Sequence, residues 1–184
     1  MKKVILVILL IFKSFCSFAA EDIKLSFTPE SSKYWQYISD RTMGGISDGE
    51  AVLEQDGDIF FARLTGNVST KNNGGFIQLR SRISFDNSER DEKKIKGVRL
   101  NVRGNGEVYH IFIRTDQTQS YRDYYSASFV ANSSWKMIDL PFKKFKHRLS
   151  NSNLEGKKIR TFAIVAYGRD FTSDVSVSNI IFYF

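Results

Sequence analysis

The chain has 184 residues, of which 27 are Lys or Arg and 20 are Asp or Glu, giving a formal net charge of +7. This length fits a single domain of ordinary size rather than several domains. Because Cys16 is the only cysteine, an intramolecular disulfide and a cysteine-rich metal site are excluded.

Residues 1–20 have the pattern of a secretory signal peptide. Lys2 and Lys3 precede an apolar run over residues 4–12, which is too short to span a bilayer. Cleavage after residue 20 leaves 184 − 20 = 164 residues, a charge of 24 − 20 = +4 and no cysteine. We therefore expect an exported protein, periplasmic or secreted, with one domain over residues 21–184 and no stable membrane insertion after cleavage.

Apolar and polar residues alternate along most of the remaining chain, which predicts short β-strands. In chain order, the predicted strands are 51–55, 59–65, 75–83, Gly97–Gly104, Val108–Thr115, 124–130, 135–140, 160–167 and 175–183. Many short strands with turn residues between them are typical of an all-β sandwich or barrel. The glycines between Gly97–Gly104 and Val108–Thr115 further predict that these two strands form a hairpin.

Helical patterning is scarce in this chain. Phe142, Phe145 and Leu149 have helical spacing, enough for two turns at most. The charged residues 88–96 predict an exposed loop. We therefore expect at most one short helix.

One serine motif points to catalysis only superficially. Residues 45–49 match the Gly-x-Ser-x-Gly nucleophile motif, with Ser47 at its centre. That motif requires a strand followed by a helix, whereas alternation predicts another strand here, so a glycine-rich loop is favoured. A hydrolase that uses Ser47 or His110 is kept as the weaker alternative.

Other candidate chemistry in the chain is weaker still. Asp48, Asp56 and Asp58 could bind Ca²⁺, but they lack EF-hand spacing and are better explained as turn residues. The basic residues 143–148 could contact anionic lipid or nucleic acid, although a solvated surface is favoured. We expect no metal, no cofactor and no nucleic-acid partner.

Polar side chains occupy the positions that alternate with the apolar residues of several predicted strands. They are Gln78, Arg80, Arg82, Arg99, Asn101, Arg103, His110 and Arg114. Guanidinium groups bind carboxylate or phosphate oxygens, and side-chain amides suit hydroxyl groups. We predict that these residues form a polar binding face, the alternative being an ordinary solvated sheet face.

Several short motifs in fixed order resemble one known family. Trp35 followed by Ser39-Asp40-Arg41-Thr42-Met43-Gly44-Gly45-Ile46-Ser47 resembles the opening signature of the complex I intermediate-associated protein 30 family. Later matches are Asn73-Gly74-Gly75-Phe76, Arg103-Gly104-Asn105-Gly106 with Tyr109, and Trp135 followed by Leu140-Pro141-Phe142. The candidate signature positions are Trp35, Asp40, Met43, Gly44, Gly45, Ser47, Asn73, Gly74, Gly75 and Phe76. The resemblance runs from about Phe27 to Tyr183.

The resemblance implies a galactose-binding-like, jelly-roll β-sandwich and a non-catalytic role with assembly intermediates of respiratory complex I (NADH:ubiquinone oxidoreductase). Two features depart from the family. Asn105 stands where the family usually has Asp, which weakens any argument for a cation there, and the leader is secretory. We therefore expect a non-catalytic, exported binding module with a protein partner or assembly intermediate. The alternative is a carbohydrate-binding module whose arginines, Asn101 and tyrosines hold an acidic glycan.

Overall fold

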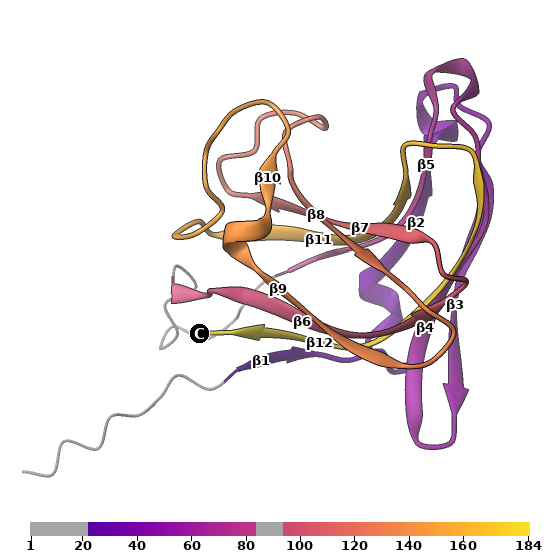
Figure 1. Ribbon diagram of the computed structural model, residues 1–184, viewed down its shortest axis with the longest axis horizontal. Helices are drawn as coiled ribbons and strands as arrows, with labels where there is room; N and C mark the ends of the chain where they lie inside the picture. The colour runs from indigo at the N-terminus through magenta and orange to yellow at the C-terminus, as the bar shows by residue number, and fades with distance from the viewer. Residues whose placement is uncertain (1–21, 84–93) are drawn as a thin grey trace, which may run out of the picture.

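The computed structural model describes residues 22–83 and 94–184, which form two antiparallel β-sheets packed face to face (Figure 1). Sheet A contains, in spatial order, β3 (Asp48–Asp56), β4 (Ile59–Val68), β12 (Phe171–Tyr183), β6 (Gly97–Gly104) and β9 (Lys136–Pro141), with β1 (Ile23–Leu25) also paired to β12. Sheet B contains β10 (Lys146–His147), β8 (Tyr125–Val130), β7 (Val108–Thr115), β11 (Ile159–Tyr167), β5 (Phe76–Arg82) and β2 (Trp35–Ser39). In Figure 1, β7, β8 and β11 run above β6, β12 and β1.

The core lies between the two sheets and follows the alternation of the sequence. Val98, Leu100 and Val102 of β6 are at most 1% exposed. Phe162 of sheet B meets Phe182 of sheet A edge to face, with ring centroids 5.7 Å apart. Such pairs contribute about 1 kcal/mol beyond the area they bury.

All nine predicted strands are present, and the predicted all-β jelly-roll sandwich is confirmed. The described residues contain no α-helix, only 3₁₀ turns: η1 (Ser32–Tyr34), η2 (Asp40–Met43), η3 (Lys71–Asn73) and η5 (Phe142–Lys144). The short helix, predicted to have two turns at most, is thus a single 3₁₀ turn; Phe142 and the following Phe145 are buried, whereas Leu149 lies beyond the turn and is 61% exposed.

The predicted hairpin between β6 and β7 is wrong, because the two strands belong to different sheets. The segment between them crosses from sheet A to sheet B. The Gly104 amide donates to the carbonyl oxygen of Asn132 (2.7 Å), and the Gly106 amide donates to that of Ala131 (2.7 Å). A Cβ at Gly104 would lie 2.6 Å from the carbonyl oxygen of Asp174. Glycine is needed for this close crossing. The prediction failed because a glycine-rich turn alone does not reveal with which strand the next strand pairs.

Two predictions concern the N-terminal segment and the loop at residues 88–96. The predicted signal peptide, and most of the loop predicted at residues 88–96, lie outside the described residues. Within residues 22–83 and 94–184, no helix has the length and apolar character needed to cross a membrane.

Candidate functional site

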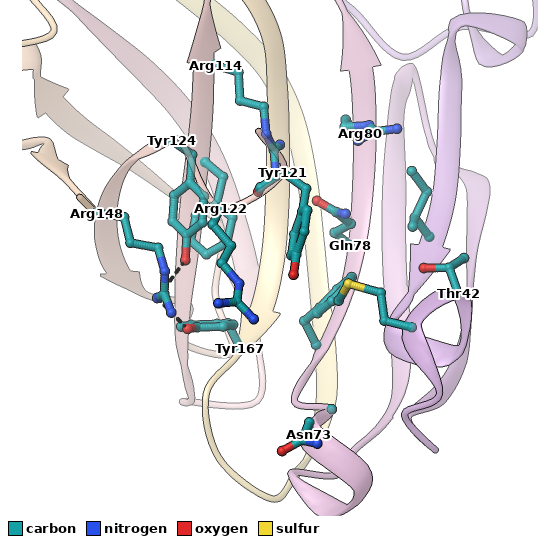
Figure 2. A pocket seen from close by; sticks show the side chains of 15 residues that line it. Thr42, Asn73, Gln78, Arg80, Arg114, Tyr121, Arg122, Tyr124, Arg148 and Tyr167 are labelled. Atoms are coloured by element: carbon teal, nitrogen blue, oxygen red, sulfur yellow. Dashed lines mark hydrogen bonds between the residues drawn. The ribbon is translucent and has the colours of Figure 1, made fainter. Parts of the chain in front are cut away.

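A groove of about 720 Å³ lies on the face of sheet B that points away from the core (Figure 2). Its walls come from β2, β5, β7 and β11, from η2 and η3, and from the segments that follow β7 and β10. The lining residues are Ile38, Thr42, Met43, Asn73, Gly74, Phe76, Gln78, Arg80, Phe112, Arg114, Tyr121, Arg122, Tyr124, Arg148 and Tyr167. We call this surface the groove.

The groove is hollow because its central strand carries short side chains. β11 lies between β5 and β7, and its outward residues include Thr161, Ala163 and Val165. Ala163 is paired with Arg80 of β5 on one side and with Phe112 of β7 on the other. The long side chains of Arg80 and Phe112 therefore flank the short side chain of Ala163. Neighbouring strands lie about 4.8 Å apart, and this distance sets the spacing between the three side chains.

Aromatic rings cover one side of the groove and form an apolar cluster separate from the main core. Phe112 and Tyr124 are stacked, with centroids 4.0 Å apart, and Tyr167 meets Phe112 edge to face at 5.3 Å. Arg148 donates hydrogen bonds to the hydroxyls of Tyr124 (3.1 Å) and Tyr167 (3.0 Å), as Figure 2 shows. Burial and the neighbouring Tyr167 hydroxyl raise the pKa of Tyr124 to about 12. Tyr124 is therefore a neutral hydroxyl at physiological pH.

Partly buried polar groups flank the floor on both sides of β11. One Arg114 nitrogen, Nη2, donates to the carbonyl oxygen of Tyr121 (2.9 Å), whereas its buried Nη1 has no partner among the described residues. Gln78 is 6% exposed, and its Oε1 also lacks a partner. Burial lowers the pKa of Arg114, and the nearby positive charge of Arg80 lowers it further. The groove thus contains polar groups that the described residues leave unsatisfied.

The loop between β7 and β8 brings two more side chains to the groove. Figure 2 shows Tyr121 and Arg122 between Tyr167 on one side and Gln78 on the other. Tyr121 is 60% exposed, and the Arg122 guanidinium lies 5.3 Å from the centroid of its ring. An exposed aromatic ring is therefore available to a ligand.

The signature residue Asp40 holds one end of the groove from the inside. Asp40 is 0% exposed, and its Oδ2 accepts hydrogen bonds from Ser47 Oγ (2.5 Å), Gly75 N (2.6 Å) and Phe76 N (3.1 Å). Its Oδ1 accepts one from Ser47 N (2.9 Å). Burial alone would raise the pKa of Asp40, but the hydrogen bonds from Ser47, Gly75 and Phe76 outweigh it and lower that pKa. We call this set of contacts the Asp40 lock.

The signature glycines are explained by the same lock. A Cβ at Gly45 or at Gly74 would collide with the Asp40 carboxylate. Gly44 has φ of +87° and Gly75 has φ of +124°, a region that favours glycine.

The remaining signature residues lie either at the groove or at the edge of the main core. Met43, Asn73 and Phe76 line the groove. Trp35 instead packs on Phe27, with ring centroids 4.7 Å apart, at the edge of the main core.

The structure divides the eight residues of the predicted polar face between two surfaces. Gln78, Arg80 and Arg114 line the groove, and Arg82 and His110 lie on the same outward face of sheet B. Arg99, Asn101 and Arg103 lie on the outward face of sheet A, on the other side of the sandwich. All eight point away from the core as predicted, but strand alternation does not specify to which sheet a strand belongs.

The polar residues on sheet A have partners of their own. Arg99 lies 3.7 Å from Asp139, and Arg103 lies 3.3 Å from Asp56. Asn101 Nδ2 donates to Ser178 Oγ (3.2 Å). These groups are less available to a ligand than those of the groove.

Sequence reasoning missed the residues that complete the groove. These are Ile38, Thr42, Phe112, Tyr121, Arg122, Tyr124, Arg148 and Tyr167. The aromatic and basic sequence of residues 121–125 is the signal that could have found the loop. The positions on β7 and β11 depend on strand order, which alternation does not reveal.

Neither serine arrangement resembles a working catalytic site. Ser47 is 0% exposed, and its hydroxyl is held in the Asp40 lock. Elsewhere, Ser150 Oγ is 2.7 Å from His147 Nδ1, and His147 Nε2 is 2.6 Å from Asp123. In serine hydrolases it is Nε2 that meets the serine and Nδ1 that meets the aspartate, so the two nitrogens here are reversed. We interpret these hydrogen bonds as structural contacts that hold the segment after β10 against the segment after β7.

The candidate calcium ligands have other roles where the structure places them. Asp48 lies 3.5 Å from Arg41, and Asp56 pairs with Arg103. Within the described ranges, no group of three or more His, Cys, Asp or Glu side chains is arranged to hold a metal ion.

The fold and the groove together define a jelly-roll sandwich with a concave surface on one sheet. The sequence pattern of complex I intermediate-associated protein 30 matches residues 25–174, and the chain belongs to that family. The predicted family is thus confirmed. No curated protein sequence gives a significant match.

Solved structures of carbohydrate-binding modules share this fold. The family 11 module of the cellulosomal cellulase Lic26A-Cel5E of Clostridium thermocellum aligns with a TM-score of 0.70 and 16% identity, over 90% of this chain and 95% of that one. The Clostridium thermocellum family 11 module in complex with a β-1,3-1,4-mixed-linked tetrasaccharide gives 0.65 and 16%, over 88% and 95%. The family 30 module of cellulase Cel9D-Cel44B from the same organism gives 0.54 and 11%, over 80% and 90%. At these identities the likeness concerns the fold.

Proposed function

We propose that this protein is a non-catalytic, exported binding module that takes a saccharide in the groove of sheet B. The observation that carries the proposal is the combination of aromatic rings and unpartnered polar groups in one concave surface. Saccharide rings present both C–H faces and hydroxyls, so they suit a site that offers stacking surfaces beside hydrogen-bonding groups.

The contacts fit these two kinds of interaction. Tyr121 offers an exposed ring, while Tyr124 and Tyr167 offer hydroxyls at the groove wall. Gln78 supplies a side-chain amide at the floor. The carbohydrate-binding modules that share the fold, one of them in complex with a tetrasaccharide, support the same interpretation.

A protein partner is the second candidate, in line with the assembly role that the family's name implies. Its support is the exposure of two apolar side chains, Met43 (47%) and Ile46 (45%), on residues 40–47, which we call the signature loop. Exposed apolar side chains that lie together are common at protein interfaces. We place this candidate second because the groove combines polar and aromatic side chains in one concave surface, whereas the protein candidate rests on two exposed apolar side chains.

The saccharide proposal is tested by native electrophoresis of residues 21–184 through gels that contain mixed-linkage β-glucan or other soluble glycans. Retardation by at least one glycan is expected. Tyr121→Ala should raise the dissociation constant about fivefold, since an aromatic contact contributes about 1 kcal/mol.

Tyr34→Ala is the matched control, because Tyr34 is 61% exposed and lies outside the groove. It should leave retardation unchanged. If no glycan retards the protein, or if both variants weaken binding equally, saccharide binding in the groove is rejected. Partner capture from an envelope extract, repeated with Met43→Ser, then tests the protein candidate.

A further inference from the structure

The charged side chains that line the groove are all positive. Four arginines line it, namely Arg80, Arg114, Arg122 and Arg148, and none of the described lining residues is Asp or Glu. By contrast, Arg63, Arg99 and Arg103 on sheet A each lie within 4 Å of a carboxylate. A concave surface with charges of one sign concentrates its field on the ligand that enters it.

Two of these arginines flank the floor of the groove. Arg80 and Arg114 come from β5 and β7, on either side of β11, as Figure 2 shows. Burial lowers the pKa of both guanidinium groups, and the positive charge of Arg80 lowers the pKa of Arg114 further. The Arg80 guanidinium has no hydrogen bond or ion pair with any described residue. Two partly desolvated guanidinium groups whose charges disfavour each other are stabilised when an anion lies between them.

Three buried polar atoms without partners among the described residues lie on β5, β7 and β11. They are Gln78 Oε1 on β5, Arg114 Nη1 on β7 and Thr161 Oγ1 on β11. Thr161 pairs in register with both Arg114 and Arg82. Unsatisfied buried groups are rare in folded proteins and call for a ligand or bound water. Two of these atoms belong to residues that line the groove: Arg114 Nη1 is a donor that suits an acidic group, and the Gln78 amide suits sugar hydroxyls.

We propose that the groove binds an anionic saccharide, with its carboxylate or sulfate group held between Arg80 and Arg114. This inference rests on the saccharide function proposed above and adds the charge of the ligand. The planar fork of arginine matches the oxygens of either acidic group. The aromatic side of the groove then takes the sugar ring next to the acidic group, and Gln78 contacts its hydroxyls.

The test uses two polymer pairs in which the acidic group is the main difference, polygalacturonate with its methyl ester and dextran sulfate with dextran. Binding of residues 21–184 is measured by isothermal titration calorimetry. In at least one pair the charged polymer should bind about tenfold more tightly or better, and the difference should shrink as salt screens the charges. The pair that responds identifies a carboxylate or a sulfate ester as the acidic group.

Variants separate specific recognition from general attraction to a basic protein. Arg80→Gln and Arg114→Gln should each reduce binding of the charged polymer about tenfold. Arg99→Gln and Arg103→Gln remove the same charge from sheet A and should leave binding nearly unchanged. Circular dichroism confirms that each variant is folded.

The outcomes are distinguishable. Equal binding of the charged and neutral members in both pairs overturns the anionic preference but leaves saccharide binding intact. Equal losses in the sheet A and groove variants overturn the role of Arg80 and Arg114. Failure of all four polymers and of mixed-linkage β-glucan to bind rejects the saccharide function together with this inference.

Discussion

Asp40→Asn is the substitution that most directly tests the Asp40 lock. The two side chains have nearly the same shape, so the change removes charge and one acceptor without leaving a cavity. Whichever way the new amide is turned, its NH₂ group faces backbone or hydroxyl donors that now bond to the carboxylate. The best orientation keeps the three hydrogen bonds to one oxygen and sets the NH₂ against Ser47 N.

The magnitude follows from these four hydrogen bonds. Each of the three retained bonds loses about 1 kcal/mol because its acceptor is no longer ionised. The unsatisfied Ser47 N–H costs about 2 kcal/mol more. Relief from burying a charge returns about 2 kcal/mol, so a net loss of about 3 kcal/mol in the free energy of unfolding is expected. For a domain of this size, that loss lowers Tm by about 6–12 °C.

Urea and thermal unfolding of the wild type and Asp40→Asn at pH 7 measure this loss. Asp48→Asn serves as the control, because Asp48 is exposed and its ion pair with Arg41 lies at the surface; its Tm should stay within about 2 °C. A shift of similar size in both variants would refute the claim that Asp40 organises the signature loop.

The same lock predicts a pH dependence. The folded pKa of Asp40 is lowered, so its carboxylate stabilises the fold fully above its unfolded pKa of about 3.9. That stabilisation is lost as the pH falls through the folded pKa, below about 3.9. The stability gap between wild type and Asp40→Asn should therefore be constant from pH 7 to about 5 and narrow at lower pH. A gap that widens on acidification contradicts the assigned direction of the pKa.

Two further substitutions test the groove floor and the sheet crossing. Ala163→Leu should place a larger side chain between Arg80 and Phe112 and abolish saccharide retardation in native gels, while thermal unfolding shows a loss of about 1–3 kcal/mol from overpacking. Tyr109→Phe should lose about 1–3 kcal/mol in urea unfolding, because the buried hydroxyl donates to Asn105 Oδ1 (2.7 Å) and accepts from Asp174 N (2.9 Å). Tyr121→Phe, at an exposed hydroxyl, should leave urea unfolding unchanged.

Local patterns in the sequence were enough to predict nine of the strands and their inner and outer sides, but not β1, β2 and β10. Val98, Leu100 and Val102 are buried and Arg99 and Arg103 point outward, as alternation requires. Alternation has a period of two residues and depends only on neighbours along one strand. It therefore carries information about burial and none about strand order.

The candidate site depended on strand order, which is why its prediction was incomplete. The groove exists because β11 carries Ala163 between Arg80 and Phe112, three residues far apart in the sequence. The predicted hairpin failed for the same reason, since β6 pairs with β12 and β9 rather than with β7. The signature glycines were recognised by their resemblance to a family, but their cause, the buried carboxylate of Asp40, became visible only in three dimensions.

The signature loop divides its residues between two duties. Asp40 and Ser47 are buried and hold the backbone, whereas Met43 of the same loop lines the groove. A change at Met43 therefore alters the wall of the groove without touching the hydrogen bonds that hold the loop in shape. The side chain that faces a ligand can thus be changed independently of the contacts that fix the backbone beneath it.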